Sequence, residues 1–193
     1  QMHYAGFASG DQNSITFLAS LSSDDAINRV TSDPGYQQFN DHSLMPTTIP
    51  VLSLWQEMYR VIYKSNAVIE GLNASEKLSA NLKLSLAAEA KFLRAFCYFN
   101  LVNLYGDVPL ITTTDYHLNR LSRRSSKEDV YKQVIEDLKF AKANLSQSVI
   151  IKGRANCFAA MALLAKTYLY TAQYQQAAEE ADKIISSGNY ALS

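Results

Sequence analysis

The chain has 193 residues, of which 48% are apolar and 19% charged, so it can bury a sizeable core and lacks a disordered composition. Lys plus Arg (18) balance Asp plus Glu (18), and this zero net charge argues against a broad electrostatic surface for nucleic acid or anionic lipid. No apolar run reaches the roughly 18–20 residues of a membrane-spanning helix. The seven glycines and four prolines are too few for an all-β fold with many tight turns.

Residues 1–50 show the least regular pattern. An amphipathic segment near Ile15–Leu21 follows Ser14, which can cap a helix. The stretch from Thr31 to Pro50 is polar and aromatic and holds three of the four prolines, which predicts an irregular, loop-rich segment. Loops of this length in compact domains are often functional.

From residue 51 onward, apolar residues recur at three- and four-residue spacing, which predicts one helix after another with short connections. The expected helices cover residues 51–71, 79–105, 125–141, 154–171 and 174–187. Ser125 and Glu128 fit a capping box at the start of the third. The sequence therefore predicts an all-α protein of stacked antiparallel helix pairs.

The last two helices carry small and large apolar residues in alternation. They resemble the tetratricopeptide repeat, a helix pair of about 34 residues. The residues that carry this likeness are Leu164, Ala165, Tyr168, Tyr174, Ala177, Ala181 and Ile184.

The segment AEAKFLRAFCYFNLVNLYGDVPL, residues 88–110, places charges on an otherwise apolar helix. Glu89 and Arg94 fall on apolar stripes, and buried charges need partners, so we expect both to anchor neighbouring helices, with Asn66 as a polar partner. Gly106 suits the end of a helix, and Pro109 then keeps the chain extended. Cys97 and Cys157 lie on predicted helices without metal-ligand spacing; two buried thiols are expected, and a disulfide between them is the alternative.

The same segment resembles the most characteristic part of the SusD/RagB family through FLRA, YF, LV and GDVPL, the last containing Gly106, Asp107 and Pro109. Ala88 and Lys91 replace the Gly and Arg that are usual in the family. Further blocks follow in the family's order over essentially the whole chain. They comprise Trp55, Tyr59, Ile62 and Asn66; Val130, Tyr131, Ile135, Asp137 and Leu138; and Gly153, Arg154, Ala160, Leu164 and Tyr168.

This resemblance implies a cell-surface lipoprotein of the Bacteroidota outer membrane. Such a protein captures glycans, or peptides in the RagB branch, for a SusC-like TonB-dependent transporter. The chain is expected to be one SusD-like amino-terminal helical domain, residues 1–193: a capping helix and irregular loop over 1–50, then helical repeats over 51–193. Family members are longer and have an acylated amino-terminal cysteine, so the carboxy-terminal part and the lipid anchor are expected outside this chain.

Glycan recognition requires aromatic faces for stacking and planar polar groups for hydroxyls. Tyr36, Phe39, Asn40 and His42 offer both within seven residues, and the alternative is that the aromatic rings only pin this loop to the scaffold. No metal or cofactor is predicted, because the histidines, His3, His42 and His117, share no ligand spacing and no nucleotide motif is present. No catalytic motif occurs either, which indicates a binding protein.

Two functions remain open from the sequence. The first is capture of a nutrient glycan for an outer-membrane transporter. The second is a helical-repeat scaffold that binds a protein or peptide without any sugar.

Overall fold

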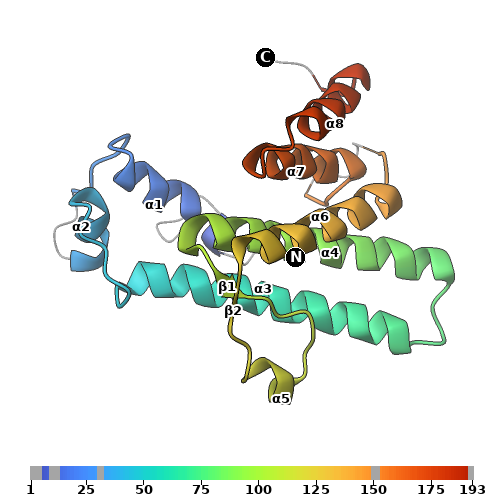
Figure 1. Ribbon diagram of the computed structural model, residues 1–193, viewed down its shortest axis with the longest axis horizontal. Coiled ribbons are helices and arrows are strands. Elements are labelled where there is room, and N and C mark those ends of the chain that lie inside the picture. The colour runs from blue at the N-terminus through green and yellow to red at the C-terminus, as the bar shows by residue number, and fades with distance from the viewer. Residues whose placement is uncertain (1–5, 9–13, 30–32, 149–152, 191–193) are drawn as a thin grey trace. The chain divides into compact units, whose positions relative to one another are not determined.

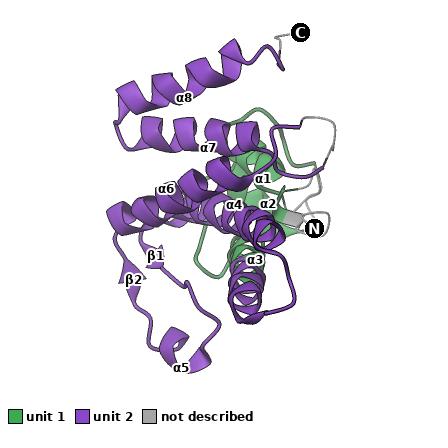
Figure 2. Ribbon diagram, turned by 90° about the vertical axis from the view of Figure 1, so that its right-hand side faces the viewer, with its two compact units in different colours: residues 1–61 green, residues 62–193 purple. Residues whose placement is uncertain are grey.

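A computed structural model describes residues 6–8, 14–29, 33–148 and 153–190 (Figure 1). His3 and residues 31–32 of the predicted irregular segment lie outside the described residues. The chain divides into two compact units, residues 1–61 and 62–193, which are coloured separately in Figure 2. The prediction of a single domain over residues 1–193 stays a prediction.

The first unit contains a short 3-10 helix, η2 (Gly6–Ala8), with α1 (Ile15–Ser22), α2 (Pro34–Asn40) and the beginning of α3 (Ile49–Ala74). Ser14 caps α1 as predicted, because its side chain accepts a hydrogen bond from the Phe17 amide. The helices enclose a small apolar core. Its members are Phe7, Leu18, Leu21, Phe39, Leu54 and Met58.

The helix α2 was not predicted, although the sequence carries a start signal for it. Asp33 accepts a hydrogen bond from the Gly35 amide at 2.8 Å, and Pro34 occupies the first turn, where its missing N–H costs nothing. The segment near residues 31–50 is therefore helical over Pro34–Asn40, irregular over residues 41–48, and helical again from Ile49, where α3 begins.

The second unit is a stack of long helices. Its first members are the end of α3 and α4 (Ala80–Tyr105), followed by α6 (Lys127–Asn144), α7 (Cys157–Tyr170) and α8 (Tyr174–Ser186). Helix α6 packs on both α4 and α7, and α7 packs on α8 (Figures 1 and 2). The predicted all-α architecture of successive packed helices is confirmed.

The predicted start of α6 is one residue off. Ser126, and not Ser125, is the N-cap, because its hydroxyl accepts from the Asp129 amide at 3.2 Å while Ser125 pairs in a strand. The family-like helix α4 begins after Ser79 and ends at Gly106, whose φ of 75° and ψ of −129° suit glycine alone among the common residues.

Between α4 and α6 the chain leaves the stack. Strands β1 (Val108–Pro109) and β2 (Arg124–Ser125) pair in antiparallel fashion and form the base of an excursion that carries α5 (Tyr116–Asn119). The sequence predicted the extended part over residues 108–114 but not α5. Asp115 caps this helix by accepting from the amides of His117 and Leu118.

The central part of the second core lies around α4. Tyr98, Leu101, Val130, Leu138 and Leu164 are fully buried there. Cys97 and Cys157 are buried and free, so the predicted pair of buried thiols is confirmed and the disulfide alternative is wrong. None of the helices in the described ranges has both the length and the apolar character that a membrane span requires.

Candidate ligand-binding surface and its scaffold

The predicted ligand residues lie on α2 and just after it. Tyr36 and Asn40 are four residues apart, so they share one face of this helix. Phe39 is only 6% exposed and packs into the core, as the alternative interpretation of the aromatic residues expected. Tyr36 is half-buried with its ring edge-on to Phe17, the centroids 5.8 Å apart at 87°.

The polar members of this set are more accessible. His42 has a positive φ of 51°, and its Nε2 lies 3.8 Å from Oδ1 of Asp24; their side chains are 58% and 82% exposed. A side-chain contact this exposed contributes little to stability, so both groups can exchange partners at small cost. The Asn40 side-chain oxygen, Oδ1, accepts a hydrogen bond from the backbone N–H of Asn28 at 3.3 Å, which fixes the orientation of this side chain.

The surface therefore combines one partly accessible aromatic ring with amide, imidazole and carboxylate groups. Gln37 and Asp41 add a second hydrogen-bonded polar pair, 2.9 Å apart, on the same short helix and its cap. Planar polar groups beside an aromatic ring suit a neutral, hydroxyl-rich ligand, because they pair with hydroxyls while the ring covers C–H groups. Burial raises the pKa of Tyr36, helped by the nearby Asp33 charge, so its hydroxyl stays protonated and can donate.

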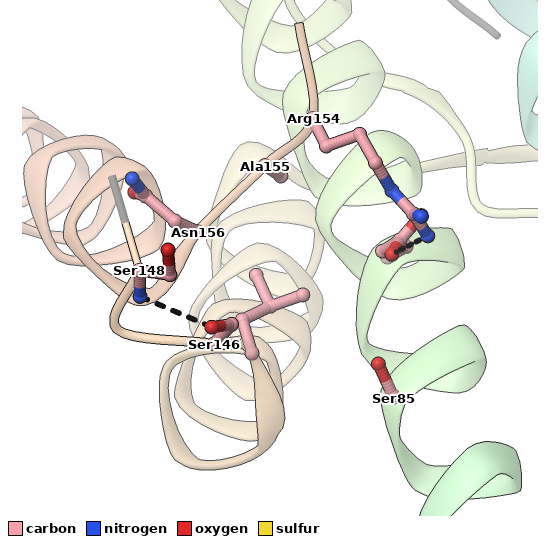
Figure 3. A pocket seen from close by; sticks show the side chains of 8 residues that line it. Ser85, Ser146, Ser148, Arg154, Ala155 and Asn156 are labelled. Carbon is pink, nitrogen blue, oxygen red and sulfur yellow. Dashed lines mark hydrogen bonds and ion pairs between the residues drawn. The ribbon is translucent and has the colours of Figure 1, made fainter. Parts of the chain in front are cut away.

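A small pocket of about 140 Å³ lies in the second unit (Figure 3). It is formed by α4 and by the two ends of the connection between α6 and α7. Its lining residues are Ser85, Glu89, Leu145, Ser146, Ser148, Arg154, Ala155 and Asn156. Arg154 forms an ion pair with Glu89. Glu89 and Arg154 were expected to support the scaffold. Their spacing in the sequence did not indicate that they line a pocket together with Ser146 and Asn156.

In the second unit, a buried polar network ties three helices together. Arg94 binds both oxygens of Asp137 at 2.8 Å and donates to the Asn66 side-chain oxygen at 2.7 Å. The exposed fractions of the Arg94 and Asp137 side chains are 6% and 0%, so the charges neutralise each other away from water. Lys91 approaches the same carboxylate at 3.4 Å.

The predicted partnership of Arg94 with Asn66 is therefore present, but its main partner, Asp137, was missed. Asp137 lies on the buried stripe of α6 with Val130, Val134 and Leu138, a placement that signals a paired charge. Glu89 does not join this network, and its partner, Arg154, is partly exposed.

The network continues into the segment after α4. The Asn66 amide donates to the carbonyl oxygens of Ile111 (3.1 Å) and Thr113 (3.4 Å). The Tyr98 hydroxyl donates to the Ile111 carbonyl and accepts from the Ile111 amide. Glu70 accepts from the Thr113 hydroxyl and from the amide and hydroxyl of Thr114, bonds that hold the pKa of the Glu70 carboxyl below its usual value.

The other residues that carry the family resemblance also have defined surroundings in the structure. Trp55 and Tyr59 pack against each other with ring centroids 4.9 Å apart. The Asp107 carboxylate accepts from the Lys127 amide at 3.1 Å, and Pro109 pairs opposite Arg124 in the two-stranded sheet. Gly153 has a φ of 84°, a left-handed conformation that glycine adopts readily, and it directly precedes Arg154, which lines the pocket.

This architecture is that of an all-α protein built from packed helices. Its long helices form the scaffold that carries the short helices and connections. Among the described residues, no group of three or more His, Cys, Asp or Glu side chains is arranged to hold a metal ion.

Comparison with known proteins gives the family. A SusD-like family described as "Starch-binding associating with outer membrane" matches residues 6–169. The SusD-like protein P25 of Formosa agariphila is 31% identical over 145 residues, which are 74% of this chain and 28% of that protein. The chain belongs to the SusD-like family.

Solved structures agree with this assignment. A laminarin-binding SusD-like protein is 34% identical with a TM-score of 0.74, and the match covers 80% of this chain and 34% of that one. A structure with a xylogluco-oligosaccharide is 25% identical with a TM-score of 0.81, covering 98% of this chain and 39% of that one. The chain thus spans about a third of the length of these relatives.

Proposed function

We propose that the protein is a non-catalytic glycan-binding protein of the outer-membrane surface that passes its ligand to a SusC-like TonB-dependent transporter. The observation that carries the proposal is membership of the SusD-like family, with relatives named for laminarin and found with a xylogluco-oligosaccharide. The Asp24–His42 pair and the Asn40 amide supply hydrogen-bonding groups beside the Tyr36 ring, a chemistry that suits neutral sugars.

The proposed contact surface consists of Tyr36, Asn40 and His42, and Phe39 supports it from the core. The proposal is tested by affinity electrophoresis of the protein purified from its own cells, in gels that contain laminarin, xyloglucan or starch. At least one glycan is expected to retard the protein, and His42→Ala and Tyr36→Ala should reduce the retardation. Tyr174→Ala, which alters an exposed tyrosine on α8, is the matched control.

Retardation by no glycan would contradict the sugar proposal. Equal retardation of the three variants would show that glycans do not bind at the surface on α2.

The transporter and the lipid anchor are tested separately. Cells that produce the protein are labelled with a fatty acid, their membranes are fractionated, and the protein is purified with what remains bound. Incorporation of the label together with an attached barrel protein is the expected result. An unlabelled protein without a barrel partner would leave the second function, a scaffold for a protein or peptide.

A further inference from the structure

The excursion that carries α5 presents apolar side chains to solvent at its tip. Tyr116, Leu118 and Leu121 are 72%, 61% and 69% exposed, and all three lie within six residues. Figures 1 and 2 show α5 at the far end of this excursion, away from α4 and α6. Single exposed apolar side chains are common, whereas three on one projecting turn form a candidate contact site.

The tip is also basic. Arg120 and Arg123 are exposed, and within the part of the chain that the structure describes neither guanidinium pairs with a carboxylate. Asp115, which immediately precedes the tip, accepts hydrogen bonds from the backbone amides of His117 and Leu118 and so caps α5. An apolar patch with two exposed arginines on its border results, although the whole chain has no net charge.

The path of the excursion is fixed from both ends. Val108 and Pro109 pair with Ser125 and Arg124, and the Arg124 guanidinium donates to the Asp107 carbonyl at 3.1 Å. Further in, Glu70 holds Thr113 and Thr114. The Asn119 side chain, on α5 itself, donates to the Thr113 carbonyl at 2.9 Å. The exposed side chains are therefore held in a defined place, which reduces the entropy that binding would cost.

We propose that this tip, residues 116–123, is a docking site for a folded protein whose surface offers an apolar depression bordered by Asp and Glu side chains. Tyrosine and arginine are enriched at the energetic centres of protein interfaces, and burying the large apolar side chains of the tip would favour binding. Electrostatic complementarity supplies the second requirement, since the unpaired arginines select an acidic partner surface.

A lipid surface fits the tip less well. Membrane-surface helices present a long apolar face, whereas α5 has only four residues. A bilayer also does not require the fixed orientation that the hydrogen bonds of the excursion give to the tip. The inference does not depend on glycan binding.

The test uses a photoreactive p-benzoylphenylalanine in place of Leu118, in cells that produce the protein, with the same replacement at Ile185 as the control. Ile185 is 73% exposed on α8 and so is equally available to random collisions. After irradiation, the adduct is purified and the cross-linked peptide is identified by mass spectrometry. We expect an adduct from position 118 but not from 185, on a peptide of another protein that carries Asp or Glu beside apolar residues.

Charge variants make the test specific. Combining Arg120→Glu with Arg123→Glu should lower the adduct yield about tenfold or more, since like charges across an interface cost more than 1.4 kcal/mol. Arg120→Lys with Arg123→Lys should retain most of the yield. Circular dichroism and the melting temperature of each variant confirm that the fold is unchanged.

Several outcomes would overturn the proposal. They are no adduct, an adduct with lipid, an adduct within the same polypeptide or with a second copy of it, equal adducts at both positions, or a yield that charge reversal does not change. Affinity electrophoresis of the same variants distinguishes the docking proposal from the glycan-binding proposal. A variant that loses the adduct while glycans still retard it has lost docking at the tip and has kept glycan binding.

Discussion

The Arg94 guanidinium holds Asp137 through two hydrogen bonds of 2.8 Å each, across 43 residues of sequence. One residue belongs to α4 and the other to α6, and both are buried. This pair joins the most strongly family-like segment to the next helix of the stack, and it fixes Asn66 in position for the segment after α4.

Removing the charge of Asp137 should therefore destabilise the fold strongly. Asp137→Asn leaves a buried guanidinium without its counter-charge, and the expected loss is about 3–5 kcal/mol in the free energy of unfolding. Glu89→Gln is the matched control, because its partner, Arg154, is 54% exposed and such pairs contribute under about 1 kcal/mol. Urea denaturation measures both, and similar losses for the two variants would contradict the central role of the buried pair.

The anchor at Glu70 should weaken in acid. Hydrogen bonds from Thr114 and Thr113 lower the pKa of Glu70 in the folded state. Because the pKa of Glu70 is lower in the folded than in the unfolded chain, its ionised carboxylate stabilises the fold. This stabilisation is fully present above the unfolded-state pKa of about 4.3 and is lost as the pH falls through the folded-state pKa. The Thr114 amide, which donates to Glu70, should then exchange faster with solvent, after correction for the intrinsic rate.

The control for this measurement is the Leu145 amide, which donates to the Ala141 carbonyl and should keep its protection over the same pH range. In Glu70→Gln, protection of Thr114 should be weaker and independent of pH. A wild-type Thr114 amide that stays protected throughout would show that Glu70 does not hold this segment.

The end of α4 should tolerate no side chain at Gly106. Its φ of 75° lies where L residues are strained, so Gly106→Ala should cost about 1–3 kcal/mol in thermal or urea unfolding. Gly71→Ala is the opposite case, since Gly71 is helical and a Cβ would meet nothing within 4 Å. That variant should be more stable by about 0.5–1 kcal/mol, and equal effects at the two positions would refute the argument from backbone geometry.

Both thiols should be unreactive in the folded protein. Burial raises the pKa of Cys97 and of Cys157, so little thiolate exists at neutral pH, and neither sulfur is accessible. A thiol reagent such as dithionitrobenzoate should label neither residue until guanidinium chloride unfolds the chain. Cys97→Ala identifies which thiol reacts, and rapid labelling of the native protein would contradict the packing around α4 and α7.

The long helices could be predicted from sequence because their apolar residues repeat at helical spacing over many turns. Short elements could not: α2 and α5 have seven and four residues, too few for a periodic pattern, and only their aspartate caps mark them. The cap of α6 shifted by one residue because two adjacent serines both fit, and strand pairing with Pro109 and Val108 decided between them.

The candidate site was less accessible to sequence reasoning. The predicted surface is continuous in sequence, so proximity of Tyr36, Asn40 and His42 followed from spacing alone, but the burial of Phe39 depends on packing. Asp137 and the pocket beside Glu89 join residues from separate helices, and no spacing rule brings them together.

The anchors of the excursion have a consequence for sequence divergence. Asn66, Tyr98 and Asn119 bind it through the carbonyl oxygens and amide of Ile111 and Thr113, groups that every residue type except proline provides. Substitutions at position 111 can therefore alter the side chain without redirecting the main chain. Such a segment can acquire new contact residues at its tip while the helices that support it remain under separate constraint.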